Sequence, residues 1–170
     1  MATQRRLMAL AAACCVACRP TPAGAATQNA QVTASIAKPL TLTSLQNLDL
    51  GTITLKPGTW SGATVAISRA GVFSCSSTNL ICTGPTQVAR YKVTGTNKQT
   101  VFITAPNVTL VNQADSTKNL TLVVDNPGQL VLTSSGEPGV NFDLGGSITL
   151  SSTAASGTYQ GTFNVTVDYQ

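Results

Sequence analysis

Two cysteines, Cys75 and Cys82, are the pair of side chains in this sequence with the clearest chemical use. Six residues separate them, and cysteines this close form a disulfide when a chain reaches an oxidising compartment. A zinc site would need two more ligands, and the chain has no histidine and no other cysteine beyond residue 18 to supply them. We therefore predict a disulfide between Cys75 and Cys82, keep a free or metal-bound pair as the alternative, and expect no cofactor.

The chain has few side chains suited to acid–base catalysis. Histidine, the commonest general acid and base, is absent. The carboxylates stand singly at Asp49, Asp115, Asp125, Glu137, Asp143 and Asp168. A glycosidase-type pair would need two of them in one cleft, and their spacing does not indicate one. Gly145-Gly146 lies between apolar residues, which predicts a bulge or turn rather than a phosphate-binding loop. We expect no enzymatic activity.

Two further features have both a functional and a structural interpretation. The loop at residues 75–82 could contact a receptor, but a disulfide-closed loop is more often a structural staple. Trp60, the only tryptophan, could contact a sugar ring, but packing over one end of the fold is the favoured interpretation.

The elements that position these residues follow an export signal. Arg5 and Arg6 precede an uncharged apolar run at residues 7–18, and residues 23–25, Ala-Gly-Ala, form a small-residue cleavage site. The run is too short to cross a bilayer, so we expect residues 1–25 to be cleaved and no membrane span to be retained. A lipoprotein signal is the alternative because cysteines occur in the run, although none follows a leucine by three residues.

Loss of the signal changes the charge of the chain. Of ten basic residues, Arg5, Arg6 and Arg19 would leave with it, so seven would face six acidic residues at a net charge of +1. No basic patch would then remain to bind nucleic acid or an anionic membrane. We predict no nucleic-acid partner.

Residues 26–170 have the length of one domain and a β pattern throughout. Charged residues make up only 9% of the chain, and short segments rich in Thr, Val and Leu alternate with turns that contain Gly or Pro. No helical period is sustained after the signal. The pattern predicts an all-β fold, an immunoglobulin-like antiparallel β-sandwich at residues 40–170.

The C-terminal segment, residues 157–170, has the most regular alternation. Polar residues occupy every even position from Thr158 to Asp168. The odd positions are Gly157, Tyr159, Gly161, Phe163, Val165, Val167 and Tyr169. This pattern predicts a strand with one face in the core and one in water. Because chain ends usually fray, a strand that reaches the penultimate residue needs a stable partner.

A second alternating run lies soon after the cleavage site and consists of Ala30, Val32, Ala34 and Ile36. Alternation places all four on one face of a strand. Pro39 would end its ladder because proline has no N–H. One interpretation of the run is an ordinary first strand that completes its own fold.

The two ends of the chain resemble those of chaperone–usher fimbrial subunits, the pilins. Members of that family carry a glycine fourteenth from the end and a penultimate aromatic residue, which Gly157 and Tyr169 match. Residues 29–39 resemble the donor strand of the colonization-factor-like branch. The resemblance implies that residues 26–39 form a donor-type strand whose four apolar side chains fill the groove of the next subunit by β-augmentation.

The pilin resemblance also implies partners and a location. It implies a periplasmic chaperone, an outer-membrane usher and like subunits in a homopolymer, with export through the periplasm to a fimbrium on the cell surface or to the extracellular space. The chain departs from the classical pilin in one respect. Classical pilins have a disulfide near the start of the fold, whereas this one would close a loop at residues 75–82, and the partner chaperone therefore stays open.

The middle of the chain resembles a domain family of unknown function from small secreted proteobacterial β-proteins. The cues are residues 48–53, Leu-Asp-Leu-Gly-Thr-Ile, residues 142–148, Phe-Asp-Leu-Gly-Gly-Ser-Ile, and the ending at 157–169. The expected function is a structural subunit of a bacterial surface fibre assembled by donor-strand exchange, with a role in adhesion. The alternative is a self-complete secreted β-sandwich that binds carbohydrate or protein through its end loops.

Overall fold

The computed structural model describes Gly24 and residues 27–170. Apart from Gly24, the predicted signal peptide at residues 1–25 lies outside the described residues. The chain divides into two units, one ending at Ser35 and one running from Ile36 to Gln170. All thirteen described strands belong to the second unit, and no helix occurs among the described residues. The predicted all-β class is confirmed.

The strands are short, because residues that favour turns interrupt the chain at frequent intervals. Their bounds are β1 (Thr41–Gln46), β2 (Thr52–Leu55), β3 (Ala63–Ile67), β4 (Phe73–Cys75), β5 (Leu80–Thr83), β6 (Ala89–Thr94), β7 (Thr100–Thr104), β8 (Val108–Asn112), β9 (Asn119–Asp125), β10 (Gln129–Val131), β11 (Val140–Leu150), β12 (Tyr159–Gln160) and β13 (Thr166–Tyr169). All their pairings are antiparallel.

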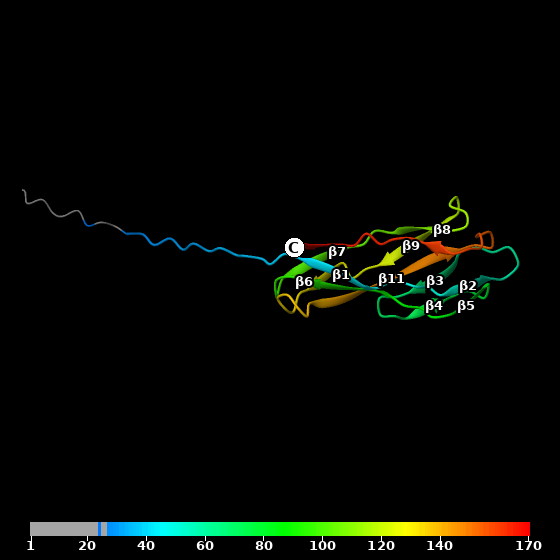
Figure 1. Ribbon diagram of the computed structural model, residues 1–170, viewed down its shortest axis with the longest axis horizontal. Helices are drawn as coiled ribbons and strands as arrows, with labels where there is room; N and C mark the ends of the chain where they lie inside the picture. The colour runs from blue at the N-terminus through cyan, green and yellow to red at the C-terminus, as the bar shows by residue number, and fades with distance from the viewer. Residues whose placement is uncertain (1–23, 25–26) are drawn as a thin grey trace, which may run out of the picture. The chain divides into compact units, whose positions relative to one another are not determined.

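The strands form an immunoglobulin-like β-sandwich (Figure 1). The larger sheet has the order β1-β6-β11-β9-β8-β12, and β3 joins it by pairing with both β11 and β4. A smaller sheet has the order β10-β7-β13, and β2 pairs with β5 in a separate ribbon. The end of the chain therefore contributes to both sheets, through β12 in one and β13 in the other.

Strand β11 corrects the sequence interpretation of Gly145-Gly146. The pattern indicated two short strands with a bulge or turn between them, but β11 continues through both glycines and changes partners there. Its first half pairs with β6, and its second half is flanked by β3 and β9. A side chain at either glycine would collide with these neighbours, since a Cβ at Gly145 would meet the backbone of Ile67 and one at Gly146 would lie 2.9 Å from Leu122. The glycines thus permit close strand approach rather than a turn.

Buried side chains gather into two clusters within residues 36–170. The first contains Leu50, Ala63, Val65, Ile67, Leu80, Val88, Val108, Leu122, Ile148 and Leu150. The second contains Ala89, Val93, Val101, Ile103, Ala105, Leu132, Phe142 and Leu144. Three partly buried residues, Leu48, Val124 and Phe163, pack against both. Side chains in a strand alternate between its two faces. In β3, for example, Ala63, Val65 and Ile67 point inward, and such alternate side chains make up the clusters.

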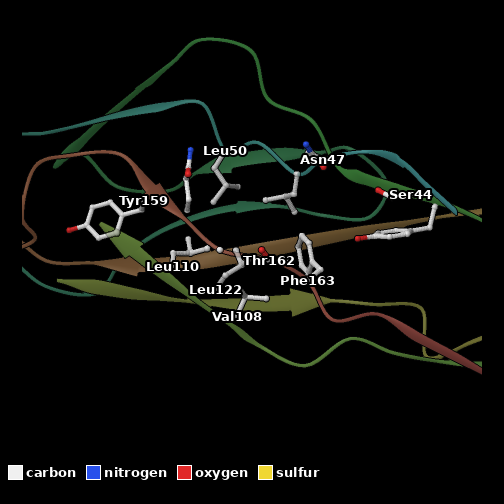
Figure 2. Close-up of a pocket in the computed structure, with 13 residues that line it drawn as sticks. Ser44, Asn47, Leu50, Val108, Leu110, Leu122, Tyr159, Thr162 and Phe163 are labelled. Carbon is white, nitrogen blue, oxygen red and sulfur yellow. The ribbon is translucent and has the colours of Figure 1, made fainter. Parts of the chain in front are cut away.

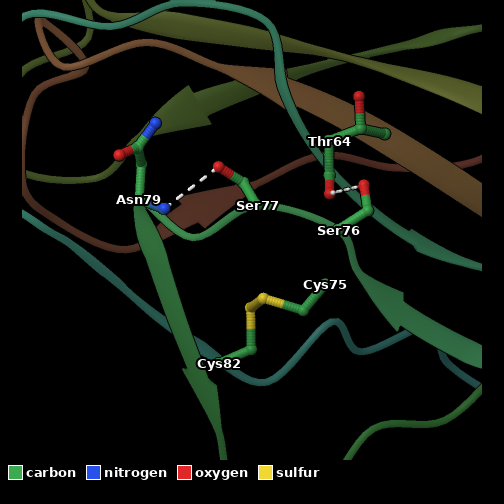
Figure 3. The surroundings of a disulfide bond; sticks show 6 residues. All are labelled: Thr64, Cys75, Ser76, Ser77, Asn79 and Cys82. Atoms are coloured by element: carbon green, nitrogen blue, oxygen red, sulfur yellow. Dashed lines mark hydrogen bonds between the residues drawn. A yellow bond between two sulfur atoms is a disulfide. The ribbon is translucent and has the colours of Figure 1, made fainter.

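The predicted disulfide between Cys75 and Cys82 is confirmed (Figure 3). Cys75 ends β4 and Cys82 lies in β5, with their Cα atoms 6.3 Å apart. Strand β4 belongs to the larger sheet, whereas β5 belongs to the β2-β5 ribbon, so the bond ties the ribbon to the sheet. Both cysteines also pack against the first core cluster.

Trp60 is partly buried and packs against the same cluster. Its indole nitrogen donates to the carbonyl oxygen of Lys56 at 3.0 Å, and its backbone exchanges hydrogen bonds with Ser152. The indole N–H therefore has its hydrogen-bond partner within the protein. These contacts fit a role in packing at this end of the fold.

Replacing both cysteines by serine should lower the free energy of unfolding by about 2–3 kcal/mol, as expected for the closure of so short a loop. The measurement is urea unfolding of the double variant. Unmodified protein unfolded with reductant is the matched comparison, and it should lose a similar amount. A double variant as stable as the oxidised protein would show that the bond does not stabilise the ribbon.

Candidate functional site

The prediction of one continuous strand at residues 157–170 is wrong: the segment forms two short strands, β12 and β13, with residues 161–165 in neither. Its alternation still distinguishes an inner face from an outer one, but the inner face is only half-buried. Tyr159, Phe163, Val165, Val167 and Tyr169 are each partly buried, and the even positions between them are exposed. Gly157 and Gly161 are exposed as well. An inner face that belonged to a closed sandwich would be expected to be buried throughout. The incomplete burial indicates that this side of the core is open.

A groove of about 760 Å³ runs beside this segment (Figure 2). Its first border is formed by β1 and the residues after it: Ser44, Asn47, Leu48 and Leu50. Its second border is the start of the last segment, residues 159–163. The floor is formed by Tyr91, Val108, Leu110 and Leu122. In Figure 2, Leu50 and Asn47 lie opposite Val108 and Leu122, and the ring of Phe163 projects into the space between them.

Each border contains a strand that pairs along one edge, β1 at the first and β12 at the second. In the described chain β1 pairs with β6 alone, while β12 pairs with β8 alone and β13 with β7 alone. Residues 161–165, between β12 and β13, belong to no strand. An unpaired edge presents a row of backbone donors and acceptors that another strand can use. The groove therefore combines an apolar floor with two strand edges.

The borders run in opposite directions. The end of β13 lies beside the residues that precede β1, since the hydroxyl of Tyr169 donates to the carbonyl oxygen of Lys38 at 2.6 Å. At the other end of the groove, Leu50 lines the same space as Tyr159. A strand inserted between them would thus be antiparallel to one border and parallel to the other.

The start of the last segment is fixed by Asn112. This side chain is 1% exposed and is the one buried polar residue in the described part of the chain. Its Nδ2 donates to the carbonyl oxygen of Ser156 at 2.9 Å, and its Oδ1 accepts from the backbone N–H of Ala114 at 2.9 Å. Gly157 lies against it with φ +140°, and a Cβ there would be 2.5–2.9 Å from the amide group of Asn112. Close approach and positive φ together explain the glycine at this position.

The electrostatics of the groove favour an uncharged occupant. None of its lining residues carries a formal charge at neutral pH. Burial raises the pKa of Tyr91, and a hydrogen bond with Ser44 lowers it in part, so this phenol stays neutral. The ring of Tyr91 stacks on that of Phe142 with centroids 5.6 Å apart, which holds it in the floor.

The charged side chains lie outside the groove. The ion pairs among the described residues join Arg69 to Asp125, Arg90 to Asp143 and Lys92 to Glu137. The Arg90 pair is bidentate, at 2.7 and 2.8 Å, and its hydrogen bond to Asp143 raises the pKa of the guanidinium. No group of three carboxylate or cysteine side chains gathers within the described ranges.

The predicted donor residues lie outside every strand. Ala30, Val32, Ala34 and Ile36 are exposed, with Val32 at 91% and Ile36 at 90%. Strand β1 begins later, at Thr41. The first strand of the described fold therefore does not include this run.

Several residues of the groove did not stand out in the sequence. Asn112 and Tyr91 occur in ordinary alternating segments, and only the fold shows that one anchors the last segment and the other lines the floor. Leu48 and Leu50 lie in the Leu-Asp-Leu-Gly segment that carried the family resemblance. The motif was visible in the sequence, but the spacing of its residues gave no reason to place Leu48 and Leu50 in a groove.

Substitution of Gly157 tests the anchoring of the last segment. Gly157→Ala should cost about 1–3 kcal/mol of unfolding free energy more than Gly58→Ala, because the added methyl group must displace Asn112. Gly58 is the matched control, since its φ of +120° is also unfavourable for alanine but a Cβ there would meet only Trp60, at an ordinary 3.9 Å. Urea unfolding of the two variants gives the difference. Equal losses would contradict a specific contact between Gly157 and Asn112.

The described residues contain no helix, and therefore none that is long and apolar enough to span a bilayer. No curated protein and no solved structure matches the chain. One family model matches residues 40–169, which covers all thirteen strands. That family is described as Domain of unknown function (DUF4402), and the chain belongs to it.

Proposed function

We propose that this protein is a structural subunit of a bacterial surface fibre, assembled when the N-terminal run of one subunit fills the groove of the next. The observation that carries the proposal is the open, uncharged groove beside the half-buried start of the last segment, residues 159–163. The family match assigns no activity, so the support comes from the groove and from the exposed run at residues 30–36.

The run and the groove have complementary chemistry. The run presents four apolar side chains at alternate positions, Ala30, Val32, Ala34 and Ile36. The groove offers an apolar floor and two strand edges with unpaired backbone groups. An added strand would gain its affinity from the backbone ladder and its specificity from side chains that enter the groove.

The free energy available from such an insertion is substantial. Burying a Val or Ile side chain is worth about 1.5–3 kcal/mol, and Val32 and Ile36 are almost fully exposed in the isolated chain. A domain is typically stable by about 5–15 kcal/mol. Insertion of a strand would therefore raise the stability of the receiving subunit by a large fraction.

The pilin resemblance supplies the remaining parts of the proposal. In this view the chain is exported, and a periplasmic chaperone covers the groove of each free subunit. An outer-membrane usher then promotes exchange of the chaperone for the run of a neighbour. The fibre stands on the cell surface and serves adhesion.

A rearranged chain tests the proposal. Residues 40–170 are followed by a short Gly/Ser linker and residues 29–38, so that the run can enter the groove of its own chain antiparallel to the last strand. We expect a monomer whose melting temperature is about 10 °C above that of the native order, since each added kcal/mol raises it by a few degrees. Differential scanning calorimetry and light scattering measure the two quantities.

The matched controls change one face of the run at a time. Val32→Asp with Ile36→Asp in the rearranged chain should remove the gain, whereas Thr33→Ser on the opposite face should keep it. A native-order chain that is already a stable monomer, with a rearranged form no more stable, would contradict strand donation. That outcome would favour the self-complete binding module.

A further inference from the structure

The proposed function requires that the run of a subunit stay available for a neighbour, although the run could also insert into the groove of its own chain. Seven residues of extended strand, from Ala30 to Ile36, span about 23 Å. The border from Thr41 to Leu50 is longer than that. Chain length alone would therefore allow the run to fold back along β1 into its own groove, and a subunit closed in this way could not donate.

Closure within one chain requires a reversal at a defined place. The run would have to turn between Ile36 and Thr41 and then lie antiparallel to β1. The middle of that turn is Lys38-Pro39. As the first central residue of a type I turn over residues 37–40, Lys38 would need the helical backbone conformation, which the following proline disfavours.

Lys38 is also held by hydrogen bonds on both sides of its backbone. Its N–H donates to Oγ1 of Thr96 at 2.6 Å, and its carbonyl oxygen accepts from the hydroxyl of Tyr169 at 2.6 Å. The same hydroxyl accepts from the backbone N–H of Thr96 at 2.8 Å. One tyrosine thus joins the end of the last strand, the turn after β6 and the residue that precedes β1 by three positions.

The surroundings of this contact hold the hydroxyl in place. Gly95 allows the approach, since a Cβ there would lie 2.6 Å from the Tyr169 oxygen and 2.8 Å from Leu40 and from Leu132. The ring of Tyr169 packs against the second core cluster. A tyrosine ring with a hydroxyl that both donates and accepts satisfies these contacts, and phenylalanine would satisfy only the packing.

We propose that the Tyr169 hydroxyl and Thr96 hold Lys38 extended and so keep the run from folding back into its own groove. The proposal rests on the function proposed above and gives Tyr169 a role as a positioning residue. The run then remains free for the groove of a neighbour. A neighbour's strand has no such constraint and can enter antiparallel to the last strand.

Hydrogen exchange on the full chain from residue 26 tests the proposal. The variants are Tyr169→Phe, which removes the hydroxyl, and Thr96→Val, which removes the acceptor for Lys38 without touching the groove. In dilute monomeric protein we expect both to raise the protection of the amides of residues 30–36 by roughly fivefold to tenfold, the effect of one uncharged hydrogen bond on an equilibrium. The rate of fibre assembly at high concentration should fall in parallel.

Ser135→Ala is the matched control. Ser135 accepts a hydrogen bond from the backbone N–H of Asn97 in the same turn, at 2.9 Å, and does not contact Lys38. It should leave the run as unprotected as in the unmodified chain. If Tyr169→Phe and Thr96→Val both leave the run unprotected, the positioning role is wrong.

A peptide experiment separates that failure from failure of the groove itself. The full chain with Val32→Asp and Ile36→Asp keeps its groove and Tyr169 but carries a run that cannot fill a groove. A fluorescent peptide of residues 28–38 should bind to it, as measured by anisotropy. If the peptide binds but the run stays unprotected from hydrogen exchange in Tyr169→Phe and Thr96→Val, only the positioning role is wrong. Absence of peptide binding would overturn both proposals.

Discussion

The last segment of this protein is hydrogen-bonded along one edge through β12 and β13, and its start, residues 159–163, borders a groove. Backbone N–H and C=O groups in a fold need partners or water, so the unpaired edge decides how the domain meets its surroundings. β12 and β13 pair with different sheets, and the segment therefore closes one side of the sandwich while leaving the other side open. Its two ends are fixed, by Asn112 at the start and by the hydroxyl of Tyr169 at the finish.

The groove persists because its borders are held apart by ladders of their own. β1 is fixed by five register positions on β6, and β12, at the other border, by two on β8. Bringing the borders together would break hydrogen bonds of these ladders, and each bond lost would cost about 0.5–1.5 kcal/mol. The disulfide ties the β2-β5 ribbon to the sheet, and both cysteines pack on the first core cluster, which also contains Leu50, Val108 and Leu122 of the groove. The disulfide and the groove thus share one core cluster.

Sequence patterns predicted those features that depend on neighbours along the chain. The alternation from Tyr159 to Tyr169 predicted which side chains face inward, and six intervening residues predicted the disulfide. Gly145-Gly146 was misinterpreted because a glycine pair is typical both of turns and of places where strands approach closely. The two cases differ in the neighbouring strands, which the sequence does not show. The depth of the groove was not predictable either. Half-burial of an inner face depends on what covers that face in three dimensions, and the alternation is the same for a covered and an uncovered face.

An open apolar edge and an exposed apolar run would each be a hazard in an isolated domain, because both invite unspecific pairing. The proposed strand donation would account for both with one contact. That contact would join different surfaces of identical subunits, and such a head-to-tail contact continues as a fibre when the rotation between subunits does not close a ring. The period of two also sets its register: a slip by one residue would turn Thr33 and Ser35 toward the floor in place of Val32 and Ile36. Because Val108, Leu110 and Leu122 line the groove and gain more from contact with apolar side chains than with hydroxyls, the alternation that makes the run a strand also determines how it would be inserted.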